Sequence, residues 1–236
     1  MTTLLAFDTA TERLTIALRH GDRTWSHAGD GGARASATLI PAILALLHGA
    51  GLALDDLDAI AFGRGPGAFT GLRTACSVAQ GLAFGADKPV LPIDSLLAVA
   101  EDARAGAGAS DLRVWVAIDA RMDQIYAAEY AHTSGGWTTH TPPMLTDCEA
   151  LSARWHTAPA QAIAGNALAV FAARLPTAGA LLFPEARPEA TAMLALAEAA
   201  WRAGEAVDAA LALPLYVRDK VAETTAERAA RALEKR

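Results

Sequence analysis

The apolar positions of this chain follow a strand period first and a helical period afterwards. An apolar run at residues 4–7 ends at Asp8, and apolar residues alternate with polar ones at 14–18. Alternation over a few residues is typical of a half-buried strand, and the turn-forming residues at 20–23 separate it from a third expected strand around Trp25. The pattern therefore predicts an antiparallel meander with Asp8 at its first turn.

Two stretches of helical period follow, separated by a glycine-rich segment. In LIPAILALLHG (residues 39–49) apolar residues cover most of the helix circumference, and we expect the helix to start close to Pro41, because proline is tolerated in a first turn. A second helix is expected from Thr70, with small residues that allow close approach of another helix. A helix that is apolar nearly all round is buried on more than one side, so the first should meet its own sheet and a second surface.

Short apolar strands at 58–62 and 89–93 flank the second helix, and Ser95 is expected to cap a further helix running to about Ala103. The small, flexible residues ARAGAGAS (103–110) then mark a boundary between subdomains 1–105 and 106–236. From Arg218 to the end the sequence carries charges of both signs, which is typical of a solvated helix.

The first pattern recurs beyond that boundary. LLAFDTATERLTIAL (4–18) and WVAIDARMDQIYAAE (115–129) both read as strand, aspartate, turn and strand, which places Asp8 and Asp119 at matching turns. Self-similarity of this kind indicates duplication of a structural unit. The sequence therefore predicts a duplicated α/β fold with one aspartate in each half.

Composition narrows the functional classes. Of 236 residues, 53% are hydrophobic and 19% charged, which indicates a folded globular chain. The longest apolar runs fall short of the roughly 20 residues that span a bilayer, and the start lacks the basic region of a signal peptide. Two cysteines indicate no disulfide framework, so we expect a cytoplasmic protein. A net charge of −6 with scattered Lys and Arg argues against independent nucleic-acid binding.

The sequence gives little support for a metal site or for a catalytic nucleophile. No two of the six histidines are four residues apart, so a helical His-x-x-x-His site is absent, and there is no Gly-x-Ser-x-Gly elbow. Cys76 lies within a helix of small residues, where a buried spacer is the simpler interpretation. We expect neither a catalytic residue nor a bound metal.

Nucleotide binding is the one chemistry that several residues favour together. Asp8, Thr9 and Thr11 offer a carboxylate and two hydroxyls for a hydrated Mg²⁺ and a phosphate. GRGPGAFTGLR (63–73) leads into a helix N-terminus, which attracts anions, but it lacks the Lys-Ser/Thr of a P-loop. Its glycines could equally serve a tight turn that lets the next helix pack on the sheet. The candidate anion-site residues in or facing this loop are Gly63, Arg64, Gly65, Gly67, Thr70, Arg73 and Asp119.

Four segments together resemble the TsaB family, also called YeaZ. They are FDTAT (7–11), AFGRGPGAFTGLR (61–73), AIDARMDQIYAAEY (117–130) and PLYVRD (214–219), and they occur in order over nearly the whole chain. The resemblance implies a duplicated actin/Hsp70-like (ribonuclease H-like) fold. It also implies a role in making threonylcarbamoyladenosine (t6A) in tRNAs that read codons beginning with A.

The family's members act there as non-catalytic subunits. The resemblance implies heterodimerisation with the catalytic paralogue TsaD, and the small ATPase TsaE joins that pair. It also implies homodimerisation when TsaD is absent, and contact with tRNA only through the complex. No cofactor of its own is expected, since ATP and Mg²⁺ belong to the partner complex.

The family's pairing surface lies on the first two helices. The residues implied for it are Leu39, Ile43, Leu46, Leu47, Leu72, Ala75, Ala79 and Leu82. The remaining alternative is an autonomous ATPase or small-molecule kinase of the actin-like superfamily that would use Asp8, Asp119 and the glycine loop.

Overall fold

The computed structural model describes residues 1–218, with only the backbone of Ala33. The predicted tail beyond Arg218 therefore lies outside the described residues. The first half of the chain forms a five-stranded sheet of order β3-β2-β1-β4-β5, in which β1–β3 are antiparallel and β4 and β5 run parallel to β1. Its strands are β1 (Thr3–Asp8), β2 (Arg13–His20), β3 (Arg23–Asp30), β4 (Ala59–Gly65) and β5 (Val90–Asp94).

The second half repeats this topology. Its sheet has the order β8-β7-β6-β9-β10, again with an antiparallel meander followed by two strands parallel to the first. These strands are β6 (Leu112–Asp119), β7 (Gln124–Thr133), β8 (Gly136–Asp147), β9 (Ala162–Ala164) and β10 (Leu181–Phe183). Asp8 and Asp119 end the equivalent strands β1 and β6, so the predicted duplicated α/β, actin-like fold is confirmed.

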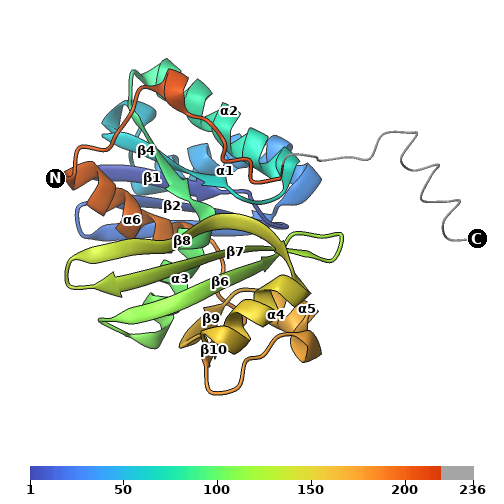
Figure 1. The fold of residues 1–236 in the computed structure, drawn as a ribbon. Coiled ribbons are helices and arrows are strands. Elements are labelled where there is room, and N and C mark those ends of the chain that lie inside the picture. The colour runs from blue at the N-terminus through green and yellow to red at the C-terminus, as the bar shows by residue number, and fades with distance from the viewer. Residues whose placement is uncertain (219–236) are drawn as a thin grey trace, which may run out of the picture.

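Helices cover both sheets, and one pair fills the space between them (Figure 1). Helices α1 and α2 pack on one face of the first sheet, and α6 packs on the other. Helix α3 packs on the second sheet and contacts α6, while α4 and α5 cover the outer face of the second sheet. The helices are α1 (Ala35–Ala50), α2 (Phe69–Ala86), α3 (Ser95–Ala107), α4 (Cys148–Thr157), α5 (Ala167–Val170) and α6 (Ala190–Arg202). Short 3₁₀ turns lie at η1 (Gly32–Arg34), η2 (Leu54–Asp56), η3 (Ala172–Arg174) and η4 (Ala209–Leu211).

Three expected boundaries differ from the structure. Helix α1 starts at Ala35 and carries Pro41 in its second turn; Pro41 and Ala37 are both exposed, so the carbonyl that proline leaves without a donor is not trapped in the core. Asp94, not Ser95, caps α3, because its carboxylate accepts the Leu96 and Leu97 N–H groups. Helix α3 also extends to Ala107, through much of the expected linker.

The chain returns to its first half after completing the second sheet. Helix α6 packs on the first sheet, and η4 contacts α2. Beyond η4, residues 212–218 continue toward the second half, and we call them the strap. The division at residue 105 stays a prediction, with α6 and η4 packed against the earlier subdomain. None of the helices among residues 1–218 is long and apolar enough to cross a membrane.

Three glycines spaced four residues apart bring β4 and α2 against the first turn. A Cβ atom at Gly63 would lie 1.8 Å from an Asp8 carboxylate oxygen, and one at Gly67 would lie 2.6 Å from the Ala10 carbonyl oxygen. At Gly71 it would lie 1.9 Å from the carbonyl oxygen of Thr9. Such contacts are impossible for a side chain, so each glycine allows a close backbone approach. The glycines therefore serve the geometry of the loop, which is one of the two interpretations that the sequence left open.

This packing predicts opposite effects for two Gly→Ala substitutions in the same helix. Gly71→Ala should lower the free energy of unfolding by about 3 kcal/mol, because the methyl group overlaps a backbone carbonyl that cannot move away. Gly85→Ala meets no atom within 4 Å and should raise it by about 0.5–1 kcal/mol through helix propensity. Urea unfolding of both variants measures the difference; equal stabilities would contradict the close approach.

Candidate functional site

Asp8 lies at the end of β1 with both carboxylate oxygens bound to the protein. Its side chain is buried; Oδ1 accepts the Ala10 N–H at 2.6 Å, and Oδ2 accepts the Ser95 hydroxyl at 2.6 Å. The Ser95 oxygen in turn accepts the N–H of Gly65 at 3.2 Å. The carboxylate thus joins β1, the first turn of α3 and the end of β4.

Burial sets the protonation of this carboxyl group. Removal from water raises the pKa of Asp8 to about 6, against the opposing effect of the Ser95 and Ala10 hydrogen bonds. The charge of Glu189 makes a smaller contribution in the same direction.

The two threonines after Asp8 are also engaged locally. Thr9 is fully buried and donates its hydroxyl to the carbonyl of Gly71 at 2.7 Å. Thr11 exchanges hydrogen bonds with the backbone of Arg13 at 3.2 and 3.3 Å. The first N–H ahead of α2, that of Ala68, donates to the carbonyl of Ala10 at 2.7 Å. The backbone of the first turn is thus hydrogen-bonded directly to the residue ahead of α2.

A cleft of about 390 Å³ separates the two halves, and both matching turns contribute to its walls. Asp119 lines it, as predicted for a facing aspartate, whereas Asp8 does not. Asp119 accepts the N–H of Arg121 at 2.9 Å and pairs with its guanidinium at 3.2 Å. Arg121 also reaches Glu12 of the first turn at 3.2 Å, so one arginine contacts both turns.

The second turn has an unusual backbone. Arg121, Met122 and Asp123 all have left-handed φ angles of 57–62°, a conformation that non-glycine residues rarely adopt in succession. Asp123 is held by two hydrogen bonds from Arg174 at 2.6 and 2.9 Å. These bonds and the Gln124 N–H to the Arg121 carbonyl at 3.1 Å fix the strained turn. Strain of this kind is tolerated where surrounding contacts over-determine the conformation.

The strap crosses the cleft, a feature that sequence reasoning missed. Its Leu215 N–H donates to the Arg64 carbonyl at 2.7 Å, and the Arg218 guanidinium donates to the Ala120 carbonyl at 2.8 Å. The ring of Tyr216 lies 5.3 Å from that of Phe69. Leu215, Tyr216 and Arg218 all line the cleft. The strap thus connects the end of β4 with the β6–β7 turn over the position where the predicted nucleotide would enter.

Neither arginine of the glycine segment reaches this cleft. Arg73 stacks on Phe69 with its guanidinium carbon 3.9 Å from the ring centroid, and its Nε donates to the Tyr216 hydroxyl at 3.3 Å. Arg64 lines a different groove, beside Asp94 on the α3 and α6 side. Of the predicted anion-site residues, Thr11, Gly67 and Asp119 line the cleft, whereas Asp8, Thr9, Gly63, Gly65 and Thr70 do not.

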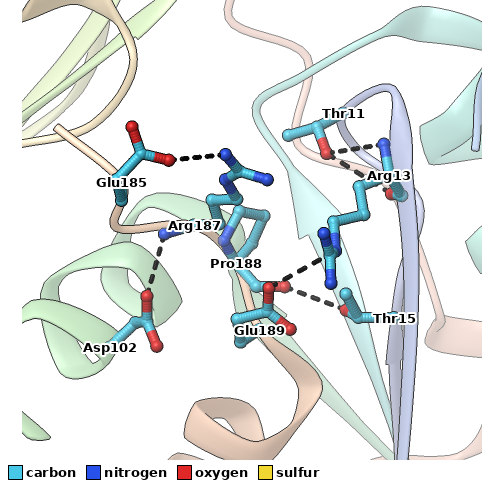
Figure 2. A network of polar contacts seen from close by, with 8 residues as sticks. All are labelled: Thr11, Arg13, Thr15, Asp102, Glu185, Arg187, Pro188 and Glu189. Carbon is cyan, nitrogen blue, oxygen red and sulfur yellow. Dashed lines mark hydrogen bonds and ion pairs between the residues drawn. The ribbon is translucent and has the colours of Figure 1, made fainter. Parts of the chain in front are cut away.

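A second polar network ties the segment between β10 and α6 to the rest of the fold (Figure 2). The Arg187 N–H donates to Asp102 of α3 at 3.0 Å, and Thr15 of β2 donates to the Pro188 carbonyl at 3.1 Å. Glu189 pairs with Arg13 at 3.6 Å. Burial raises the pKa of Asp102. This crossover, like the strap, joins residues far apart in the sequence, and no local pattern signals it.

The predicted interface residues lie mostly in the protein's own core. Leu39, Ile43, Leu47, Ala75 and Ala79 are at most 2% exposed and pack in the core on the first sheet. Leu72, also 2% exposed, lines the cleft. Leu46 and Leu82 are only partly buried. The large apolar side chains that α1 and α2 expose are Ile40, Leu44 and Phe84.

Metal chemistry finds no site among residues 1–218, where no three His, Cys, Asp or Glu side chains come together in a suitable group. Cys76 and Cys148 are free and buried. Cys76 donates to the carbonyl of Ala212 and so anchors the start of the strap.

The raised pKa of Asp8 predicts a pH dependence of stability. The folded state binds this proton more tightly than the unfolded state, so stability contributed by Asp8 is present at low pH and is lost as pH rises from about 4 through about 6. The loss should be about 3 kcal/mol, from a shift of about two units. Asp8→Asn cannot ionise and should lack this loss. Urea unfolding of both proteins from pH 4 to 7.5 checks it; parallel profiles would contradict the assignment.

The chain is similar to solved and curated proteins over much of its length. A structure described as YeaZ from Pseudomonas aeruginosa is 41% identical and superposes with a TM-score of 0.83, covering 92% of this chain and 100% of that one. The tRNA threonylcarbamoyladenosine biosynthesis protein TsaB of Haemophilus influenzae is 46% identical over 54% of this chain and 53% of its own length. The protein of the same name from Escherichia coli is 39% identical over 56% and 57%. The chain thus spans about half the length of these curated relatives.

A family model supports the same assignment over most of the sequence. The model for tRNA N6-adenosine threonylcarbamoyltransferase, TsaD, matches residues 32–233. The chain therefore belongs to the family that this model describes and, within it, to the TsaB (YeaZ) proteins.

Proposed function

We propose that this protein is a non-catalytic subunit required for threonylcarbamoyladenosine modification of tRNAs that read codons beginning with A. It acts by pairing with the catalytic paralogue TsaD in the cytoplasm. The names of its TsaB relatives and the matching family model support the pathway. The ATPase TsaE joins that pair, tRNA is contacted only through the complex, and ATP and Mg²⁺ are held by the partners.

One observation carries the non-catalytic part of this proposal. The Asp8 carboxylate, the group best placed by sequence to hold a hydrated Mg²⁺, is buried and already accepts hydrogen bonds from Ala10 and Ser95. Beside it, the Thr9 carbonyl lies against Gly71, and the Ala68 N–H ahead of α2 already donates to the Ala10 carbonyl. A phosphate that used the Ala68 N–H would have to displace that hydrogen bond, which costs free energy.

The pairing surface follows from the burial of α1 and α2. Ile40 and Leu44 lie one turn apart on α1 with 40% and 47% of their surface exposed, and Phe84 of α2 is 63% exposed. Large apolar side chains that a helix exposes are a feature of protein–protein interfaces. We assign this exposed face to contact with TsaD, and to a second copy of the chain when TsaD is absent.

The alternative is an autonomous ATPase or small-molecule kinase. The cleft of about 390 Å³, with Asp119 in its wall, is the observation that favours it. The strap reduces that support, because Tyr216 and Arg218 occupy the cleft's side between β4 and the second turn. An enzyme of this class would also need a metal-binding carboxylate other than Asp8.

Charge on the exposed face of α1 should abolish pairing. Leu44→Glu places a carboxylate in the proposed apolar contact, so we expect at least a hundredfold weaker binding to TsaD, because a buried unpaired charge is costly. Leu182→Glu, at a leucine of similar exposure on the edge strand of the other sheet, is the matched control and should bind like the wild type. Calorimetry with purified TsaD measures both.

That experiment also needs separate measurements of folding and of tRNA modification. Both variants should keep wild-type circular dichroism, because both leucines are exposed. Reconstituted tRNA modification should require this chain. It should fail when the chain carries Leu44→Glu and should proceed with the control variant. Unchanged binding of that variant would refute the assigned surface, and full modification without the chain would refute the proposed role.

Titration of the isolated chain with MgATP distinguishes the proposed non-catalytic subunit from the ATPase or kinase alternative. We expect no binding at micromolar strength, which would correspond to about −8 kcal/mol. Micromolar binding that Asp119→Asn removes would instead support the ATPase alternative. Asp22→Asn, in the β2–β3 turn away from the cleft, is the control for nonspecific loss of a charge.

A further inference from the structure

The side chain of Arg64 is turned to an unexpected face of the sheet. In regular alternation it would follow Ile60 and Phe62 toward α1 and α2. The pairing of β4 with β5 is irregular at this point, because Gly63 pairs with Ile93 and Gly65 with Asp94, which leaves Arg64 as an extra residue. Such a bulge re-aims the side chain that it contains. Arg64 consequently lines a groove of about 680 Å³ on the α3 and α6 side.

The Arg64 guanidinium lacks an acceptor. Its Nε is buried without a hydrogen-bond partner, and within residues 1–218 no acceptor is bonded to any other nitrogen of the group. Asp94 interacts with Arg64 through space. Its oxygens accept the Tyr130 hydroxyl at 2.8 Å and the Leu96 N–H at 2.8 Å. The Arg64 side chain as a whole is half-buried and lines the groove, so its guanidinium offers a position for an oxyanion.

Besides Arg64, the groove is lined by Arg104 and by the acidic residues Asp94, Glu101 and Glu205. Glu101 accepts two hydrogen bonds from Arg104, at 2.8 and 2.7 Å, and a third from the Trp137 indole N–H at 2.9 Å. Glu205 lies at the rim as a further exposed carboxylate. Of the two arginines that line the groove, Arg64 is the one to which no carboxylate of residues 1–218 is hydrogen-bonded. The bond from Trp137 to Glu101 holds the indole in place as one wall of the groove.

The lining also indicates the shape of the occupant. Trp137 contributes a ring, and α6 contributes the small side chains of Ala195, Ala199 and Ala203, spaced four apart on one helix face. Small residues leave room against a helix, and a fixed indole favours stacking with a planar group. The volume lies in the range of small-molecule sites.

A peptide strand does not fit the same groove. Val90 exchanges backbone hydrogen bonds with Val207 on the outer edge of β5, so by alternation residue 92 also faces outward. That residue is Pro92, which has no N–H to donate to an added strand. The edge of β5 is thereby closed to strand addition.

We propose that this groove binds a small organic anion with a planar ring, whose carboxylate or phosphate contacts Arg64 and whose ring lies against Trp137. This site is separate from the cleft between the two turns and from the exposed face of α1 and α2. It does not depend on the proposed role in tRNA modification.

Four simple probes test the two parts of the site. Benzoate and phenyl phosphate carry both a ring and an oxyanion and distinguish carboxylate from phosphate; benzyl alcohol lacks the charge, and inorganic phosphate lacks the ring. With ligand-observed NMR titrations on the full chain, we expect at least one ring-bearing anion to bind at least tenfold more tightly than either control probe. No preference for a ring-bearing anion would overturn the inference.

Variants then locate the binding. Arg64→Gln should weaken the preferred probe at least tenfold, Arg64→Lys less so, and Arg73→Gln, at the other arginine of the same glycine segment, not at all. Ala199→Phe should block the groove; Ala199 is exposed, so this variant keeps its fold, which circular dichroism checks. Binding that survives both Arg64→Gln and Ala199→Phe would place the ligand elsewhere and refute the site.

Discussion

The hydrogen bonds of the buried Asp8 carboxylate connect elements on which the first half of the fold depends. One oxygen fixes the turn after β1 through Ala10, and the other holds Ser95 at the start of α3. Through Ser95 the same link reaches the N–H of Gly65 at the end of β4. A carboxylate in this position would cost too much free energy to bury without such partners. The group has thus become part of the packing between strand, loop and helix.

The glycine segment packs directly against Asp8 and the turn that follows it. Gly63 leaves space for the carboxylate itself, while Gly67 and Gly71 admit the backbone of Ala10 and Thr9. This packing engages Asp8, Thr9 and the Ala68 N–H in bonds within the protein, and Asp8 does not line the cleft. The second half differs, because Asp119 itself lines the cleft beside a strained turn. One duplicated unit has therefore produced two chemically different turns.

Different helices cover the two faces of the first sheet. Helices α1 and α2 cover one face and still expose Ile40, Leu44 and Phe84 on their far side. On the opposite face, α6 and α3 fill the space between the sheets, and Arg64 lies at the edge of that layer. The proposed contact with TsaD and the proposed ligand groove therefore lie on opposite sides of the first sheet.

The sequence by itself determined the duplicated topology, since alternation at 14–18 and its counterpart around 125 are local signals that each strand carries in its own residues. It also determined that α1 is apolar all round and that Asp8 and Asp119 end equivalent strands. Only the tertiary structure decided which face of α1 is buried, because Leu39 and Ile40 are equally apolar. It alone decided that Ser95 binds Asp8, that a bulge turns Arg64 to the α3 and α6 side, and that the strap crosses the cleft. These features depend on contacts between residues far apart in the chain, and such contacts leave no periodic trace in the sequence.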